Sequence, residues 1–384
     1  MKNRALLGAT ALTAVLALAL GGCVSKVDSG TGSASTIKIG VFEPMTGANG
    51  GGGTMEVEGA KLANKLYPEV NGQKIELVIT DNKSDKVEAA NAGKRLVEQD
   101  GVKAIIGSWG SGLSMSAGAA FQAAQVPAVA ASATNPNVTA NNPYYFRVCF
   151  IDTFQGKVLA QLAYNELKAK KVSVVQEITN DYSVGLASYF SDEFKKLGGE
   201  VMEGGKYNTG DTDFNALLTN VKSQNPDVVF APGNFTESAL VIKQARQLGM
   251  QQPFLGGDTW ETPEFITTGG ASVNGALLTT FFSTENPINE TSKKFIEEYK
   301  KEYNKEPSAV AALAFDAYLV IRNAIEQTKS TDGPTLQKYL STLKDFDGAT
   351  GNITMNETRD AVKDVVIKTV KDGKFAYQTT IKHS

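Results

Sequence analysis

From residue 36 onward, short apolar runs alternate with amphipathic stretches, and this alternation constrains the fold more than any other feature of the sequence. The first series reads IKIGVFEPM, MEVEGAKLANKLY, KIELVITDN, SDKVEAANAGKRLVEQ, VKAIIGS, SGLSMSAGAAFQAAQ and PAVAAS. Continuous apolar runs separated by helical patterns are typical of parallel strands that are buried on both faces. The pattern therefore predicts β-α-β units.

The same alternation begins again after YYFRVCF and runs to PFLGGDTW. Two successive series predict an α/β fold with two doubly wound, Rossmann-like lobes. We expect the first lobe to combine 36–150 with 283–350, and the second to combine 151–282 with 351–384. Three hinge crossings, near 150–152, 281–284 and 348–352, would join them. The end of the chain, DVVIKTVKDGKFAYQTTI, predicts a hairpin that turns at Asp372-Gly373.

The first 22 residues, MKNRALLGATALTAVLALALGG, read as a secretory signal peptide: two basic residues, an apolar run and then small residues. A membrane-spanning anchor is the alternative, but the apolar run is short and interrupted for a bilayer span. Leu20-Gly21-Gly22-Cys23 resembles the bacterial lipobox, in which the cysteine is lipidated. Residues 23–35 are small and polar and predict a flexible tether. We therefore expect an extracytoplasmic lipoprotein, anchored to the membrane through Cys23.

Composition excludes several classes of function. Acidic residues outnumber basic ones, 41 to 38, and no basic stripe occurs, so nucleic acid is not an expected partner. The one histidine, His383, is a poor candidate for a catalytic triad at the penultimate position. With Cys23 lipidated, Cys149 stands alone in an apolar setting, which predicts an inert buried thiol and no metal cluster. No enzyme, metal or cofactor is expected.

In open α/β sheets, ligands bind outside the carboxyl ends of the strands. Small and polar residues follow the predicted strands of both series at that end. They are Pro44 to Gly47, Ser108 to Ser111 and Ser132 to Thr134 in the first series, and Asn180 to Tyr182, Gly233 to Phe235 and Gly257 to Trp260 in the second.

Two of these strand ends, at Ser111 and at Ser132 and Thr134, suit a carboxylate. Ser111 stands where a strand gives way to a helix, and unpaired backbone N–H groups at a helix start favour an anion. No Lys or Arg and no GK[ST] motif accompanies them, so a singly charged carboxylate fits better than a polyphosphate. The alternative is structural: Ser111 would cap its helix and Thr134 would support the Asn135-Pro136 turn.

Nearly the whole chain after residue 35 resembles the type 1 periplasmic solute-binding proteins of ABC importers, specifically the leucine/isoleucine/valine-binding branch. The matching stretches include IKIGVFEPMTG, MEVEGAKLA, LVITDNKSDKVEAANAGKRLVEQDGVKAIIG, PAVAASATNP, NDYSVGLA, DTDFNALLTNVKSQNPDVVF and ALVIKQARQLGMQQPFLGGD. The spacing of these stretches holds along most of the chain, which is more specific than any single motif.

The resemblance implies a role for several residues. The ligand carboxylate would lie on Ser111 and on the loop of Ser132, Ala133 and Thr134. The family's aromatic residue in the second lobe falls on Tyr182, and its acidic residue for the ligand ammonium falls on Asp258. We expect Asp258 to lack a partner in the empty cleft, so that neutralising it leaves stability unchanged. Asp258 as a loop cap is the alternative.

Two departures from the family pattern affect specificity. Gly52 stands where branched-chain members have a bulky aromatic residue, and Asn234 stands where they have a tyrosine. Trp109, Phe235 and Trp260 are candidates to refill the space, and each is equally a candidate for packing. The side chain of the bound amino acid is therefore left open, as larger or more polar than leucine.

The resemblance implies a monomer that captures a free amino acid and delivers it to the permease subunits of an ABC importer. A binding protein for amides or urea is an alternative within the same fold, since such ligands need no partner for a carboxylate and an ammonium. A sensor that presents its ligand to a receptor is a second alternative. A Rossmann-type enzyme is the third, but the chain has no GxGxxG motif and no activated nucleophile.

Overall fold

The structure is a computed structural model that describes residues 36–383. Within this range, no helix is both long enough and apolar enough to cross a membrane. The predicted signal peptide, the predicted tether and the predicted lipidation site Cys23 lie outside the described residues.

The first sheet has six strands in the order β2-β3-β1-β4-β5-β6. Their bounds are β1 Ile37–Glu43, β2 Glu69–Val70, β3 Gln73–Asp81, β4 Ala104–Ile106, β5 Ala128–Ala130 and β6 Tyr145–Arg147. All neighbours are parallel except β2, which pairs antiparallel with β3 at the edge. The parallel pairing brings the carboxyl ends of β1, β4 and β5 to one edge of the sheet.

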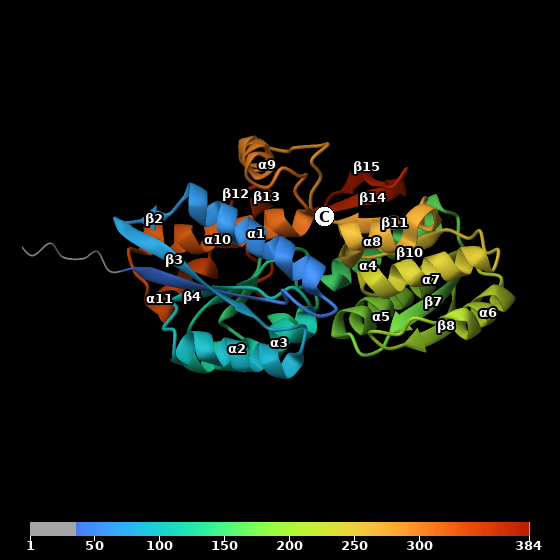
Figure 1. Cartoon of the computed structure of the whole chain (residues 1–384), viewed down its shortest axis with the longest axis horizontal. Helices are drawn as coiled ribbons and strands as arrows, with labels where there is room; N and C mark the ends of the chain where they lie inside the picture. Colours follow the sequence, from blue (N-terminus) through green and yellow to red (C-terminus); the bar gives the residue numbers. More distant parts are fainter. Residues whose placement is uncertain (1–35, 384) are drawn as a thin grey trace, which may run out of the picture. The chain divides into compact units, whose positions relative to one another are not determined.

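Helices cover both faces of this sheet: α1 and α10 lie on one face, and α2 and α3 lie on the other (Figure 1). The helices on this side of the molecule, with α9 and α11 included, have the bounds α1 Gly50–Leu66, α2 Lys86–Glu98, α3 Ser111–Ala124, α9 Glu290–Tyr303, α10 Ala309–Thr328 and α11 Gly333–Leu340. The two helices α1 and α10 pack closely because of Gly59, where an added Cβ would stand 2.0 Å from the Ala311 carbonyl oxygen. The apolar runs thus fold as strands buried on both faces, as predicted.

The second sheet has seven strands in the order β15-β14-β11-β10-β9-β7-β8. Their bounds are β7 Lys171–Glu177, β8 Glu200–Tyr207, β9 Val228–Phe230, β10 Phe254–Gly256, β11 Leu277–Thr280, β14 Val365–Lys371 and β15 Lys374–Ile381. The strands β7 to β11 are parallel, whereas β14 and β15 are antiparallel. Lys371 pairs with Lys374, which confirms the hairpin predicted at Asp372-Gly373.

The helices of the second sheet have the bounds α4 Asp152–Gln161, α5 Asp181–Lys196, α6 Asn215–Gln224, α7 Phe235–Gln247 and α8 Pro263–Gly269. The helix α4 packs on α5, and α7 packs on α6 and α8. A π-helical segment, Leu162–Glu166, directly follows α4. With two mixed sheets dominated by parallel strands, the chain has the predicted α/β fold.

The chain passes between the sheets after β6, after β11 and again before β14. Its third passage follows a small antiparallel pair, β12 Phe346–Gly348 and β13 Gly351–Ile353. Downstream of β13, Asp360 forms a parallel bridge with Arg147, so the chain still lies beside β6 at that point. Phe150 and Phe281, on the first two passages, pack with their ring centroids 4.2 Å apart and their planes tilted by 30°.

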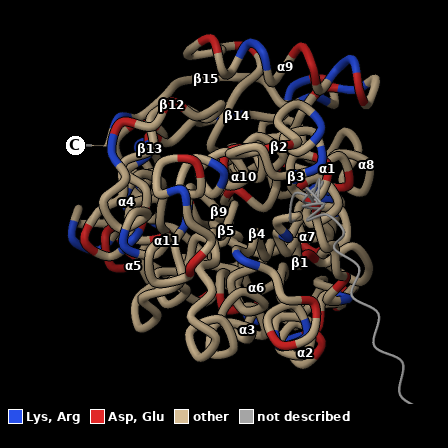
Figure 2. The backbone as a smooth tube through the Cα atoms, turned by 90° about the vertical axis from the view of Figure 1, so that its left-hand side faces the viewer, with Lys and Arg blue, Asp and Glu red and all other residues tan. Residues whose placement is uncertain are grey.

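On α9 the buried residues Ser292, Phe295 and Tyr299 recur at helical spacing. Acidic and basic residues are interspersed along the rest of this helix (Figure 2). This is the pattern of a helix with one packed face and one solvated face.

Candidate functional site

A cavity of about 100 Å³ lies between the carboxyl ends of the strands of the two sheets. Most predicted site residues line it, namely Trp109, Ser111, Ser132, Thr134, Tyr182, Asn234 and Asp258. Ala133 and Gly52 were also predicted for the site but are not part of this lining. The cavity is small beside the roughly 300 to 1,000 Å³ of pockets that take drug-sized ligands.

Contacts between the two sides close the cleft over this cavity. Lys86 at the start of α2 pairs with Asp181 at the start of α5, at 2.6 Å. The Asn135 side-chain amide donates to the Asp181 carbonyl at 2.9 Å, and the Asn234 amide donates to Asn49 Oδ1 at 3.0 Å. Each contact joins an element of the first sheet to one of the second, so this conformation is closed.

Ser111 begins α3 but does not cap it. The N-cap is Gly110, which adopts φ 90° and offers no side chain. The Ser111 hydroxyl instead accepts a hydrogen bond from the Asn135 backbone N–H at 3.1 Å. The capping alternative for Ser111 is therefore wrong. Ser111 and Gly112 line the cavity at the positive end of the helix dipole.

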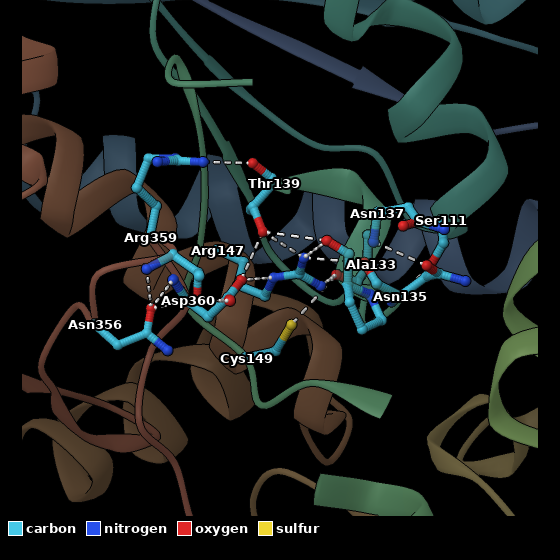
Figure 3. Close-up of polar contacts among 12 residues, drawn as sticks. Ser111, Ala133, Asn135, Asn137, Thr139, Arg147, Cys149, Asn356, Arg359 and Asp360 are labelled. Carbon is cyan, nitrogen blue, oxygen red and sulfur yellow. Dashed lines mark hydrogen bonds and ion pairs between the residues drawn. The ribbon is translucent and has the colours of Figure 1, made fainter. Parts of the chain in front are cut away.

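The loop after β5 is held from behind by Arg147, which has no exposed surface. Its guanidinium donates to the Ala133 carbonyl at 2.6 Å and to the Asn135 carbonyl at 2.9 Å, while its Nε pairs with Asp360 at 2.6 Å. Figure 3 shows Arg147 between Asp360 on one side and this loop on the other, with Ser111 beyond the loop.

These hydrogen bonds from Arg147 to the loop, together with its ion pair with Asp360, form what we call the Arg147 clamp. The clamp sets the direction of the loop's peptide groups. In a trans peptide the C=O and N–H point in opposite directions. Because the Ala133 carbonyl faces Arg147, the N–H of Thr134 faces away from it, toward the side on which Ser111 lies. Sequence reasoning missed Arg147, although an arginine inside the apolar run YYFRVCF was a usable signal, since a buried charge needs partners.

Asp258 lies opposite, at the start of the 3₁₀ turn η3 (Asp258–Trp260) that follows β10. Its Oδ1 accepts hydrogen bonds from Gln155 Nε2 at 2.6 Å and from the Tyr182 hydroxyl at 2.9 Å. Burial raises the pKa of Asp258 to about 6, although both donors lower it. The expectation that Asp258 has no partner in the empty cleft is wrong, because Gln155 on α4 and Tyr182 on α5 both reach it.

Tyr182 reaches Asp258 because the backbone leaves room for its hydroxyl. An added Cβ at Gly257 would stand 1.9 Å from the Tyr182 hydroxyl oxygen. The helix that carries Tyr182 begins with Asn180 as its N-cap, whose side chain accepts from the Tyr182 N–H at 3.1 Å. Tyr182 is therefore fixed both at its backbone and at its ring.

Trp109 occupies the space beside Gly52. An added Cβ at Gly52 would stand 2.4 Å from the Trp109 ring, and Trp109 packs edge-to-face on Phe235 with ring centroids 6.0 Å apart. An aromatic wall is thus present, supplied by the loop between β4 and α3 rather than by α1. Trp260 is fully buried and stacks on Phe265 at 4.8 Å, outside the cavity lining, so its role is packing.

Asn234 precedes α7, and its side-chain amide is hydrogen-bonded to other residues of the protein. Its oxygen accepts from Asn180 at 3.0 Å and its nitrogen donates to Asn49 at 3.0 Å, across the cleft. Its backbone N–H donates to Glu177 at 2.8 Å. Although Asn234 lines the cavity, both ends of its amide have partners in the protein.

Two mixed sheets with a closed cavity at the carboxyl ends of the strands define a two-lobed α/β ligand-binding protein. The comparisons with known proteins agree: a sequence model of the periplasmic binding protein family matches residues 36–374. The chain belongs to this family.

Curated relatives and solved structures cover most of the chain. It is 31% identical to Leu/Ile/Val-binding protein homolog 3 of Brucella melitensis, over 84% of this chain and 88% of that protein. The leucine-binding protein LivK of Thermotoga maritima has a TM-score of 0.89 and 41% identity, over 90% of this chain and 99% of that one. LivJ of Streptococcus pneumoniae, solved with isoleucine, has a TM-score of 0.84 and 33% identity, over the same shares.

Proposed function

We propose that this protein reversibly captures a free aliphatic L-amino acid between its two sides and delivers it to the permease of an ABC importer, without turning it over. The observation that carries the proposal is the polarity of the cavity. One wall has hydroxyls and the start of α3, where Ser111 and Thr134 lie, and the other has the buried carboxyl of Asp258. The relatives named for leucine, isoleucine and valine support the same ligand class.

The α-carboxylate is assigned to the first wall. The Ser111 hydroxyl, the N–H groups at the start of α3 and the Thr134 N–H that Arg147 orients are hydrogen-bond donors for an anion. The α-ammonium is assigned to Asp258, whose ionised form it stabilises on binding. Tyr182 and Gln155 hold Asp258 in place for that contact.

The wall for the ligand side chain favours an apolar group. Trp109 restores the aromatic surface that Gly52 lacks, and Leu113 contributes beside it. Because the amide of Asn234 is already bonded to Asn49 and Asn180, it does not demand a polar ligand. We therefore propose a leucine-like side chain, in place of the larger or more polar one that the sequence alone left open.

The setting follows from the same proposal. The protein works outside the cytoplasm as a monomer, held at the membrane by a lipid on Cys23. The lobes, predicted as 36–150 with 283–350 and 151–282 with 351–384, open and close about the three passages, the third of which follows Asp360. Ligand favours the closed state. A sensor that presents the same ligand to a receptor shares this site; a permease gene beside this one would favour transport.

A thermal-shift screen tests the ligand class, with free L-amino acids, their amides, urea and short peptides compared on one preparation. Micromolar binding corresponds to about 8 kcal/mol, and a hundredfold excess over Kd stabilises the fold by about 2.7 kcal/mol. We expect leucine, isoleucine and valine to raise the Tm most and leucinamide to have little effect. If only ligands that lack a carboxylate raise the Tm, the assignment of Ser111 and Thr134 is wrong.

A further inference from the structure

Two buried acidic residues stand directly behind the cavity wall, and the site described so far does not use them. Glu43 ends β1 and Glu56 lies in α1, and neither has exposed surface. Glu43 accepts a hydrogen bond from the Trp109 backbone N–H at 2.6 Å, and Glu56 Oε1 accepts one from the Ser132 hydroxyl. Each carboxyl therefore touches a residue that lines the cavity.

The two carboxyl groups also interact with each other. Glu43 Oε1 and Glu56 Oε2 are both buried, and neither has a hydrogen-bond partner among residues 36–383. Burial, followed by the charge of Glu56, raises the pKa of Glu43 well above its usual range. Burial raises the pKa of Glu56 to about 7. Two buried carboxyls that interact with each other do not both ionise at neutral pH, so the pair retains a proton between them.

The titratable groups around the pair do not relieve this charge. Asp258 faces Glu56 from the second sheet and raises its pKa further. Tyr145 on β6 interacts with both carboxyls and the buried Cys149 interacts with Glu56, and neither group is a cation. The cation Arg147 acts on Tyr145, but it is paired with Asp360.

Ser132 connects the pair to the cavity, and its hydroxyl carries only one proton. While Glu56 is ionised, Ser132 donates that proton to Glu56 and presents lone pairs to the cavity, where they repel a ligand carboxylate. When Glu56 is protonated it donates to Ser132 instead, and the Ser132 proton is free to turn toward the ligand. The protonation state of Glu56 thus decides whether Ser132 can hold a carboxylate.

We propose that the Glu43–Glu56 pair takes up one further proton from solvent when a ligand carboxylate binds, so that Ser132 turns its hydroxyl from Glu56 to the ligand. Glu56 is then a positioning residue that acts through Ser132. The charge of the pair changes from −1 to 0, and no bond of the ligand changes. This inference rests on the proposed function, because it requires a carboxylate beside Ser132.

Titration calorimetry with L-leucine tests the proton uptake on the unmodified protein. The observed binding enthalpy should differ between phosphate and Tris at pH 7.5 by an amount that corresponds to up to one proton taken up. Above the Glu56 pKa of about 7, the affinity should fall as pH rises, by up to tenfold per pH unit. Measurements from pH 6.5 to 8.5 cover this range and stay below the titration of the ligand amine.

The variant Glu56→Gln places a permanent donor against Ser132. It should bind L-leucine at pH 8.5 at least as tightly as the parent, take up no proton, and lose the decline in affinity between pH 7 and 8.5. Glu58→Gln on the same helix is the matched control, since Glu58 bonds to Tyr299 and Lys305 outside the cavity. It should keep the parent's pH profile and proton uptake.

The outcomes separate this inference from the proposed function. Binding of L-leucine with equal enthalpy in both buffers, and with constant affinity from pH 7 to 8.5, overturns the inference and leaves the proposed function intact. A parent protein that binds no amino acid at any pH overturns both. If Glu56→Gln does not fold, the comparison of buffers on the unmodified protein decides alone.

Discussion

Neutralising Asp258 should weaken ligand binding and stabilise the empty protein at the same time. In the closed structure the Asp258 carboxyl is buried, and burial raises its pKa from 3.8 to about 6. A raised pKa means that ionised Asp258 opposes folding. When ligand binds, its α-ammonium would neutralise the charge of Asp258.

The sign and size of the stability change follow from this pKa. Between pH 3.8 and about 6 the folded protein binds more protons at Asp258 than the unfolded chain does. Stability therefore falls as pH rises through that window and stays low above it. The difference between the pKa of 3.8 and the pKa of about 6 corresponds to a loss of about 3 kcal/mol in folding stability at pH 7.5. Asp258→Asn removes this penalty but weakens the hydrogen bonds from Gln155 and Tyr182, by roughly 0.5 to 1.5 kcal/mol in total.

We therefore expect Asp258→Asn to stabilise the closed conformation by about 1 to 2 kcal/mol at pH 7.5, with little gain at pH 4. The gain for the empty protein is at most this amount, because without ligand the open state is also populated. Removing one partner of a buried charge pair costs roughly 2 to 5 kcal/mol of binding free energy. The affinity for L-leucine should accordingly decrease by a factor of between about thirty and several thousand. Urea unfolding of the empty protein at several pH values gives the first quantity, and titration calorimetry gives the second.

The control is Asp192→Asn, which makes the same substitution at an exposed position on α5. It should change neither stability nor affinity. Two results would refute the reasoning about Asp258. If Asp258→Asn binds L-leucine like the parent, the ammonium is held elsewhere. If it destabilises the empty protein by more than about 1 kcal/mol, its hydrogen bonds outweigh its charge and Asp258 is a structural cap.

Three further predictions concern the cavity wall, the clamp behind it and the closure of the cleft. Gly52→Ala places a methyl group 2.4 Å from the Trp109 ring, so we expect a loss of about 1 to 3 kcal/mol in stability and weaker L-leucine binding, measured by urea unfolding and calorimetry. Asp360→Asn leaves the buried Arg147 without its counter-charge, which should cost about 3 to 5 kcal/mol in urea unfolding; an unchanged midpoint would contradict the clamp. Saturating L-leucine should decrease the radius of gyration in small-angle scattering, and an unchanged radius would count against a hinged site.

The fold could be read from the sequence because its signals are local. Apolar runs such as VKAIIGS and PAVAAS become β4 and β5, since a strand buried on both faces must be continuously apolar. The turn at Asp372-Gly373 was equally local. The rule that ligands bind at the carboxyl ends of parallel strands then collected Ser111, Thr134 and Asp258, which the structure brings to one cavity.

What only the tertiary structure decided are contacts between residues far apart in the chain. The sequence shows a glycine at position 52, where the family has an aromatic residue. Only the folded structure shows that the Trp109 ring fills the space beside Gly52. The partners of Asp258 come from α4 and α5, about a hundred and about eighty residues earlier, so no local pattern predicts them.

The acidic pair behind Ser132 is the clearest case. A glutamate in a strand and one in a helix look like ordinary surface residues in the sequence. The sequence does not show which face of each element is buried, so it does not show that these two side chains are. The sheet order places β1 beside β4, and α1 packs over the same end of the sheet, so that Glu43 and Glu56 meet behind the cavity. Their shared proton is a consequence of burial, and burial is a property of the folded chain alone.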